Sequence, residues 1–328
     1  MNRKDFLRSL LHMAAGLAAT GTLPGWGENA NGSEPDKLPR RKLGRTGLEM
    51  PVLGLGGFHV GLAEKEQNAR AVIDVALAEG IRFFDSAEMY QAGRSEKWLG
   101  LGLKGIRKDV FLMTKTWSPK DRSAESAKRH LEGSLDRLQT EYLDLWQVHG
   151  VTDAADTDKC FRKGGAMEYI LDAKQRGLVR FVGVSGHTNP EALRRALKFY
   201  DEGWKFDAMQ FPLNPIDFHQ TSFQKELLPE IVRRGIAVLA MKTSAGGALV
   251  RQKVCSIDEC LRYALSLPVS VAIVGMETAD QVRDNARIIR TSTPFTADEV
   301  DRLLEKIRPQ ARLELEWYKK PAAAVTTS

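Results

Sequence analysis

The feature that most constrains the fold is a regular alternation of short apolar segments with longer amphipathic ones, which begins near residue 41. The short segments have the length of buried strands, and the longer ones repeat apolar residues at helical spacing. Eight strands are expected, at Val52–Leu55, Ile81–Asp85, Val110–Lys115, Tyr142–His149, Val179–Ser185, Ala208–Phe211, Ala237–Met241 and Val271–Val274. The expected helices are Glu66–Glu79, Ser95–Leu103, Ser123–Leu138, Ala166–Arg176, Pro190–Tyr200, Ser222–Arg234, Asp258–Ser266 and Ala279–Ile289.

This alternation predicts the fold class. Strands that alternate with helices pair in parallel through right-handed crossovers. Eight such units in about 250 residues indicate a (β/α)8 TIM barrel. The alternative, a doubly wound sheet, would carry G-x-G-x-x-G after its first strand. The sequence Leu53-Gly54-Leu55-Gly56-Gly57-Phe58 does not match that pattern, so we expect the barrel.

Two additions to the barrel are expected. Arg41–Met50, with turn residues Gly44 and Gly47, predicts an N-terminal hairpin that closes the barrel bottom. A C-terminal helix is predicted within Pro294–Arg308, because Thr296 followed by Glu299 forms a capping-box pattern. The expected division of the chain is a signal-peptide-like segment at 1–32, a linker at 33–40, the barrel at 41–310 and a tail at 311–328.

The N-terminus resembles an export signal. Arg3, Lys4 and Arg8 precede an apolar run at Leu10–Ala19, which is too short to span a membrane and suits a signal peptide. The basic residues resemble the twin-arginine motif with Lys4 at its second position. We therefore expect recognition by the export machinery and a periplasmic location. The alternative is an amphipathic helix on a cytoplasmic protein.

Composition narrows the functional class. The chain has 328 residues, a net charge of +6, 43% hydrophobic residues and 27% charged residues. These values exclude a disordered chain and a polytopic membrane protein. No basic run favours nucleic acid, no spacing suggests a metal site, and Cys160, Cys255 and Cys260 cannot build a disulfide framework. We expect a monomer that acts on a small molecule, without stable membrane insertion.

The candidate catalytic residues come from consecutive strand ends. Asp85, Lys115 and His149 end three expected strands, and Tyr90 follows Asp85 by five residues. Active residues of such barrels lie where the strands end. A phenol beside an ammonium is a proton donor for a carbonyl, since the ammonium is expected to lower the phenol pKa. Asp85 would hold Lys115, and His149 would orient the substrate. The alternative is a structural Asp85–Lys115 ion pair.

These residues also carry a resemblance. Gly80-Ile81-Arg82-Phe83-Phe84-Asp85-Ser86-Ala87-Glu88-Met89-Tyr90 and Gly93-Arg94-Ser95-Glu96-Lys97-Trp98-Leu99-Gly100 resemble the signature of the aldo/keto reductase superfamily. Thr114-Lys115, Asp144-Leu145-Trp146-Gln147-Val148-His149 and Gly183-Val184-Ser185 follow in the family's order. The resemblance implies a reductase that transfers hydride from a nicotinamide to a carbonyl carbon, with Tyr90 as the acid.

The resemblance further implies which residues bind the nucleotide. The implied set is Gly57, Ser185, Gln210, Met241, Lys242, Gly275, Gln281 and Asn285. Ser185 and Gln210 would bind the nicotinamide carboxamide, and Asn285 the adenine side. Gln281 stands where the family often has an arginine, and Lys242 and Arg283 are the candidates to supply that charge. NADP(H) is therefore the family's default, with NAD(H) possible.

Several alternatives stay open at this stage. A nucleotide-binding regulatory or channel-associated subunit would share the fold and turn over poorly. A lyase or aldolase would use Lys115 as a Schiff base, which pairing with Asp85 disfavours. His59 and His187 could contact ligand, Phe58 and Trp117 could face substrate, and the acidic stretch at 153–158 is expected to be a solvated loop.

Overall fold

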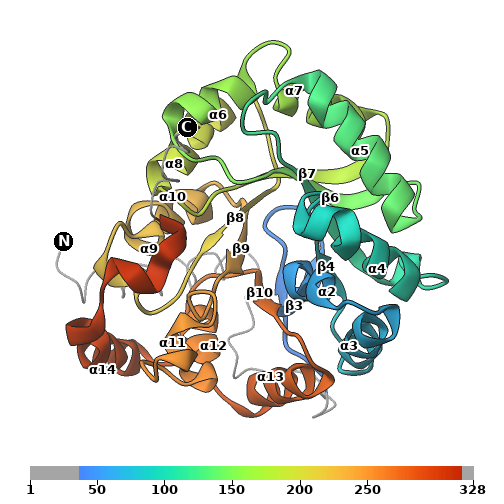
Figure 1. The fold of residues 1–328 in the computed structure, drawn as a ribbon. Coiled ribbons are helices and arrows are strands. Elements are labelled where there is room, and N and C mark those ends of the chain that lie inside the picture. Colours follow the sequence, from blue (N-terminus) through green and yellow to red (C-terminus); the bar gives the residue numbers. More distant parts are fainter. Residues whose placement is uncertain (1–36, 320–328) are drawn as a thin grey trace, which may run out of the picture.

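The computed structural model describes residues 37–319 of the chain. Eight parallel strands form a closed barrel in the order β10-β3-β4-β5-β6-β7-β8-β9, with helices around it (Figure 1). The strands are β3 Leu53–Gly56, β4 Phe83–Asp85, β5 Phe111–Thr116, β6 Leu143–Val148, β7 Val179–Ser185, β8 Ala208–Pro212, β9 Ala237–Met241 and β10 Val271–Gly275. The predicted (β/α)8 barrel is confirmed. The signal-like segment 1–32 lies outside the described residues, so export stays a prediction.

The outer layer consists of helices that follow the strands. The α-helices are α2 Gly57–Leu62, α3 Glu66–Ala78, α4 Arg94–Gly102, α5 Ala124–Leu138, α6 Ala154–Phe161, α7 Ala166–Gln175, α8 Pro190–Asp201, α9 Phe223–Glu226, α10 Leu228–Arg233, α11 Ala248–Arg251, α12 Ile257–Leu265, α13 Ala279–Thr291 and α14 Ala297–Ile307. The 3-10 helices are η1 Tyr90–Gly93, η2 Arg107–Asp109, η3 Asp217–His219, η4 Arg308–Gln310 and η5 Leu313–Lys319. No helix between residues 37 and 319 is long and apolar enough to span a membrane.

The barrel interior is filled by side chains that alternate along the strands. Phe83 and Phe111 stack there with ring centroids 4.8 Å apart, and Met113, Leu145 and Leu239 pack with them. Because strand residues alternate in direction, the residues two positions further along β4, β5 and β6 also point inward, at the C-terminal end. This alternation delivers the polar residues at the strand ends to the barrel mouth.

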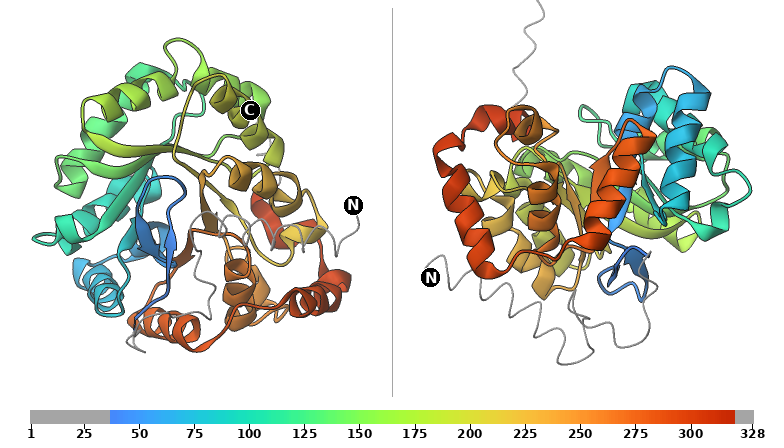
Figure 2. Two further views of the ribbon diagram at one scale, coloured as in Figure 1. Left: turned by 180° about the vertical axis from the view of Figure 1, so that it is seen from behind. Right: turned by 90° about the horizontal axis from the view of Figure 1, so that it is seen from below.

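The predicted hairpin is confirmed as β1 Arg40–Lys42 paired antiparallel with β2 Glu49–Pro51. It lies on the side of the barrel that faces away from the viewer in Figure 1 and is seen in blue in Figure 2. Leu43 in its turn is buried and packs with the interior cluster. Gly44 has a φ of +55°, and a Cβ atom there would lie 2.5 Å from the Ala237 amide nitrogen. Glycine therefore lets the turn press against the barrel floor.

One predicted helix is divided in the structure. The segment 222–234 forms two short helices, α9 and α10, instead of one. Pro229 lies in the first turn of α10 and has no amide hydrogen to continue a helix. The amide nitrogens of Phe223 and Gln224 instead donate to the Asp217 carboxylate, at 3.1 and 2.9 Å. The first amides of α9 are therefore bound by the buried Asp217 carboxylate, a contact that the hydrophobic periodicity did not indicate.

The acidic stretch 153–158 belongs to a helix, and the expectation of a solvated loop was wrong. The Asp153 side chain caps α6 by accepting from the amide of Asp156 at 2.8 Å. Asp156 is buried and accepts from Arg122 Nε and Nη2 at 2.9 and 2.8 Å. Arg122 also donates to the carbonyls of His149 and Gly150, at 2.8 and 3.1 Å. The buried ion pair therefore fixes the loop that follows β6.

The C-terminal helix is confirmed, and the chain beyond it packs back on the barrel. Thr296 and Glu299 make the predicted capping box of α14. In η5, Lys319 donates to the buried Asp217 and Glu316 carboxylates, at 2.7 Å each. Asn214 Nδ2 donates to the Tyr318 hydroxyl at 2.9 Å. These buried bonds hold η5 over the loops that follow β8 and β9.

The first prediction concerns the hairpin plug. Leu43→Ala should lower the free energy of unfolding by about 2–5 kcal/mol, because it removes a buried side chain from a packed interior. The exposed neighbour Lys42 provides the control, and Lys42→Ala should change it by less than about 0.5 kcal/mol. Urea denaturation followed by circular dichroism measures both. Equal effects of the two variants would show that the hairpin does not close the barrel.

The second prediction concerns the Arg122–Asp156 pair. Asp156→Ala should destabilise the fold by about 3–5 kcal/mol, since it leaves a buried guanidinium without its partner. Asp158 on the same helix pairs with Arg195 at a largely exposed position, so Asp158→Ala should cost less than about 1 kcal/mol. Denaturation midpoints of the two variants decide. A loss no larger for Asp156→Ala would contradict the proposed role of the pair.

Candidate active site

The structure brings the four predicted catalytic residues together at the C-terminal end of three adjacent strands. Asp85 is the last residue of β4, Lys115 lies in β5, and His149 follows β6. Tyr90 begins η1 in the loop after β4. Because β4, β5 and β6 are hydrogen-bonded neighbours, their ends meet at one rim. The structure thus brings together the three predicted strand-end residues and Tyr90 of the following loop.

A buried ion pair lies at the centre of this rim. Lys115 Nζ donates to Asp85 Oδ1 and, at 2.6 Å, to the carbonyl oxygen of Ser86. Both side chains are almost fully buried, with exposed fractions of 1% for Lys115 and 5% for Asp85. Burial lowers the pKa of Lys115 and raises that of Asp85, and the attraction between them opposes both shifts. Each residue makes burial of the other tolerable.

Tyr90 leans over this pair. Lys115 Nζ lies 3.4 Å from the Tyr90 hydroxyl and 4.9 Å from the centre of its ring. The ring meets Phe58 and His149 edge to face, with centroids 5.4 and 5.6 Å apart. The next residue, Gln91, has a φ of 47°, in the left-handed region that non-glycine residues rarely adopt. The backbone beside the phenol is therefore held in a strained conformation.

The pKa of Tyr90 shifts in the opposite direction to the expected one. Burial raises it well above its ordinary value, and the Asp85 carboxylate raises it further. The Lys115 ammonium does not reverse this shift, so the expectation of a lowered phenol pKa was wrong. The phenol is fully protonated at neutral pH and can donate its hydrogen.

His149 is neutral at the same rim. Burial lowers its pKa well below the ordinary value, and the Lys115 ammonium lowers it further. Its backbone carbonyl is held by Arg122, while its Nδ1 atom is buried and has no hydrogen-bond partner among residues 37–319. A neutral imidazole carries one N–H donor. His149 can therefore donate a hydrogen bond while it stays uncharged beside the Lys115 ammonium.

Two predicted nicotinamide contacts lie on the next two strands, β7 and β8. Ser185 ends β7, and its hydroxyl oxygen accepts from the Gly150 amide at 3.0 Å. Gln210 in β8 hydrogen-bonds toward the Asp85 carboxylate and lowers its pKa. Its Oε1 atom is buried and has no partner within the described part of the chain. A buried acceptor with no donor suits the amide N–H of a nicotinamide carboxamide, so these residues fit that group.

Three of the other predicted cofactor residues lie at the active-site end of the barrel. Met241 ends β9 and Lys242 follows it, and Gly275 ends β10 beneath the ring of His59. Gly57 begins α2 against β4: a Cβ there would meet Ser95 Oγ at 2.7 Å, so its role in the structure is close packing. The predicted contacts at Met241, Lys242 and Gly275 surround the same end of the barrel.

Gln281 and Asn285 lie on α13, in the outer helical ring (Figure 1). The Gln281 Oε1 atom accepts from the Glu277 amide at 2.7 Å, and Asn285 is buried. Arg283 pairs with Asp280 at 2.7 Å. The arginines of α13 are each paired with a carboxylate, Arg283 with Asp280, Arg287 with Asp284 and Arg290 with Glu79, so this helix offers no unpaired guanidinium for a 2′-phosphate.

One polar residue at the site was missed by the sequence analysis. Gln147 pairs in register with Lys115 and is fully buried, yet neither of its amide atoms has a partner among the described residues. It points inward below His149, because the two are separated by two positions on one strand. The alternation Leu145-Gln147-His149 could have indicated this. An unpaired buried amide costs free energy, which makes a structural role alone a poor account of it.

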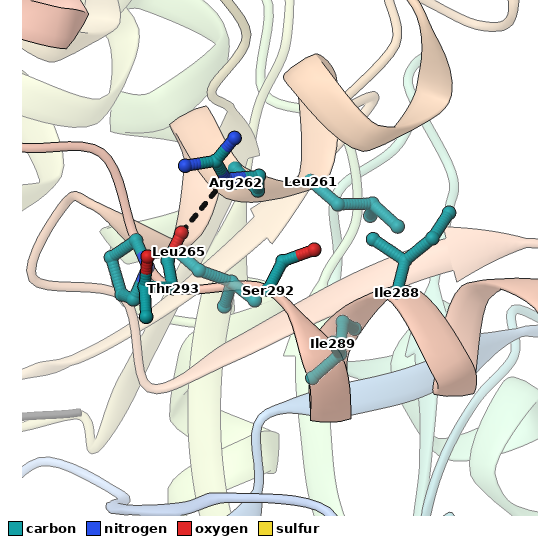
Figure 3. A pocket seen from close by; sticks show the side chains of 8 residues that line it. Leu261, Arg262, Leu265, Ile288, Ile289, Ser292 and Thr293 are labelled. Carbon is teal, nitrogen blue, oxygen red and sulfur yellow. Dashed lines mark hydrogen bonds between the residues drawn. The ribbon is translucent and has the colours of Figure 1, made fainter. Parts of the chain in front are cut away.

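The surroundings of the rim are aromatic. Phe58 on α2 is 45% exposed and lies against Tyr90. Trp117, directly after β5, is 37% exposed and lies next to Gly150. Residues 37–319 contain no cluster of three or more side chains able to hold a metal ion. The shallow recess drawn in Figure 3 lies elsewhere, between α12 and α13, and contains none of the predicted site residues. Its lining combines apolar side chains with Arg262, Ser292 and Thr293, and Arg262 donates to the Thr293 carbonyl.

Known proteins resemble this chain over most of its length. It is 35% identical to methylglyoxal reductase YeaE of Escherichia coli over 263 residues, covering 74% of this chain and 86% of that one. It is 32% identical to the glyoxal reductase of Bacillus subtilis, covering 63% and 68% of the two chains. L-Galactose dehydrogenase of Arabidopsis thaliana is 26% identical, with 83% and 96% covered.

Solved structures agree with these sequence relatives. Aldo-keto reductase AKR11C1 from Bacillus halodurans, in its holo form, superimposes with a TM-score of 0.68 at 25% identity. The match covers 82% of this chain and 96% of that structure. The family model for aldo/keto reductases matches residues 52–259, which include all four catalytic candidates. The chain belongs to the aldo/keto reductase family.

Proposed function

We propose that this protein is an NAD(P)H-dependent reductase that converts an aldehyde or ketone to an alcohol, with Tyr90 as the general acid. The observation that carries the proposal is the contact of the Tyr90 hydroxyl with Lys115, which is itself paired with Asp85. A nicotinamide nucleotide, when bound, supplies the hydride. The residues of the chain supply the proton, the orientation of the carbonyl and a dry environment.

Proton donation follows from the charges around Tyr90. The phenol stays protonated in the resting site because burial and Asp85 raise its pKa. When its proton passes to the carbonyl oxygen, negative charge develops on the phenol oxygen, 3.4 Å from the Lys115 ammonium. Lys115 thus stabilises the product of the transfer rather than the resting state. Such stabilisation of developing charge is the effect that accelerates a reaction.

Orientation of the substrate is assigned to His149. Its ring lies 5.6 Å from that of Tyr90, and the imidazole is neutral. Both side chains can therefore direct a hydrogen-bond donor at one carbonyl oxygen. General acid catalysis of this kind typically contributes about 10²–10⁴-fold to the rate. The carbonyl carbon would then face the end of β8, where Gln210 is proposed to hold the nicotinamide carboxamide.

The relatives indicate a plausible substrate range. Two of them are named as reductases of glyoxal and methylglyoxal, which are small dicarbonyl compounds. We propose that small aldehydes and dicarbonyls are substrates here too. A regulatory or channel-associated subunit stays the alternative, and the complete set of four polar residues disfavours it. A Schiff-base mechanism is disfavoured by the Lys115–Asp85 pair, which keeps the amine protonated.

Removing the phenol hydroxyl tests the role of Tyr90. Tyr90→Phe should lower kcat for reduction of methylglyoxal at least about 100-fold, because the proton donor is lost. The Kd for NADPH, measured by quenching of tryptophan emission, should change less than about twofold. Tyr169→Phe on α7 is the matched control and should keep wild-type turnover. Retained activity in Tyr90→Phe would remove Tyr90 from the mechanism.

A second prediction addresses the nucleotide. NADP(H) is the family's default, but Glu277 and the Arg283–Asp280 pair do not favour binding of a 2′-phosphate. We therefore expect Kd values for NADPH and NADH within about tenfold of each other, which is a free-energy difference of about 1.4 kcal/mol or less. Gln281→Arg should shift the preference toward NADPH by about tenfold, and Gln281→Met should not. Fluorescence titration of the three proteins measures this. Wild-type preference above 100-fold for NADPH would contradict the assignment.

A further inference from the structure

Lys242 is a second ammonium at the rim of the active site. It follows β9 and is partly buried, and its Nζ atom lies 5.5 and 5.0 Å from the ring centres of Trp317 and Tyr318. No carboxylate within the described part of the chain lies within 4 Å of it. Its charge acts on groups from five elements around the site: His59, Asp85, Lys115, His149 and His187.

The charge balance at the rim leaves this ammonium without a counter-ion. Of the two buried carboxylates that act on Lys115, Asp85 is paired with Lys115 itself and Glu96 is paired with Arg137. His149 and His187 have lowered pKa values and are neutral, with that of His187 lowered to about 4 by burial and by Lys242. Aromatic faces stabilise a cation less than a carboxylate does. The rim therefore carries a surplus positive charge close to the reacting groups.

The backbone at Lys242 is held in a strained conformation. Its φ is +52°, in the left-handed region, and its carbonyl accepts from the Ala245 amide at 2.7 Å and from Asn214 Nδ2 at 3.3 Å. Asn214 is buried and also donates to Glu316 and to the Tyr318 hydroxyl. The buried bonds that fix η5 thus also fix Lys242. Strain that the surroundings enforce is a feature of functional positions.

We propose that Lys242, on the platform of Trp317 and Tyr318, binds a carboxylate carried by the carbonyl substrate, so that the enzyme prefers oxo acids and carboxy-aldehydes over neutral carbonyls. This inference rests on the proposed reductase function. Lys242 directly follows β9, which pairs with the Gln210 strand β8, so the ammonium lies at the same end of the barrel as the carbonyl that the catalytic residues would handle. The adenosine-end residues Gln281 and Asn285 lie on α13, in the outer ring. The pyrophosphate of the nucleotide is the competing source of an anionic oxygen, and the experiment separates the two.

The preference should depend on pH. Burial and the neighbouring Lys115 lower the pKa of Lys242 to about 8, and Asp85 opposes this shift. The ammonium is therefore present below that pH and is lost above it. Selection for a carboxylate should be complete near pH 6.5 and should fade as the pH rises through about 8.

The test compares two aldehydes of one shape, 4-carboxybenzaldehyde and the neutral 4-formylbenzamide. Calorimetry gives the Kd of each for the full chain in its NADP⁺ complex, where no reduction occurs, and for the protein alone. We expect the wild-type protein to bind the carboxylate at least tenfold more tightly. Lys242→Met should abolish this ratio, Lys242→Arg should keep most of it, and the exposed Lys198→Met on α8 should not alter it.

Three results would overturn the proposal. The first is equal Kd values of the two aldehydes for the wild-type protein. The second is a carboxylate preference that survives in Lys242→Met with NADPH binding unchanged, and the third is a surviving preference in Lys242→Met combined with at least tenfold weaker NADPH binding. The last would assign Lys242 to the pyrophosphate. A folded but poorly active Lys242→Met is still informative, because binding is measured without turnover. Failure of the reductase function itself would appear separately, as a wild-type protein that oxidises NADPH with neither aldehyde.

Discussion

The ion pair between Lys115 and Asp85 is the interaction on which the rest of the site depends. An ammonium buried at the end of an apolar strand would be too costly without a carboxylate beside it. The pair is possible because β4 and β5 are adjacent in the barrel. Asp85 pairs in register with Met113, and Lys115 lies two residues further along β5 on the same inward side. The Asp85 charge acts on the pKa of Tyr90, the Lys115 charge acts on that of His149, and both act on that of Lys242. Removal of either partner is therefore expected to shift the pKa values of the groups that it acts on.

The pair also explains the protonation states around it. Burial and the Asp85 carboxylate raise the pKa of Tyr90, so the phenol keeps its proton. Burial and the Lys115 ammonium lower the pKa of His149, so the imidazole stays neutral. Two hydrogen-bond donors consequently converge on one position without a formal charge between them. The Lys115 ammonium becomes important once charge develops on Tyr90. In this account, catalysis comes from a prearranged electrostatic response rather than from an acidic phenol in the resting enzyme.

The barrel, and the meeting of the four candidate catalytic residues at one rim, could be predicted because both follow from local pattern. Strand ends at Asp85, Lys115 and His149 are visible as polar residues that close apolar runs. Features that depend on distant partners were not visible. The prediction of a solvated loop at 153–158 was wrong because burial of Asp156 depends on its ion pair with Arg122, which is 34 positions away in the sequence. The placement of η5 requires a bond between Lys319 and Asp217 across 102 positions. The sign of the Tyr90 pKa shift depends on burial, which the sequence does not display.

The central claim is that a nicotinamide donates hydride to a carbonyl carbon at this rim while the chain supplies the proton. The most direct measurement is reduction of methylglyoxal with NADPH that carries deuterium at both hydrogens of nicotinamide C4, in ordinary water, with mass spectrometry of the product. The account predicts one deuterium on the former carbonyl carbon and a hydroxyl hydrogen from solvent, with a slower rate than for unlabelled NADPH. An alcohol without deuterium, or no oxidation of NADPH or NADH with any small aldehyde, would contradict it.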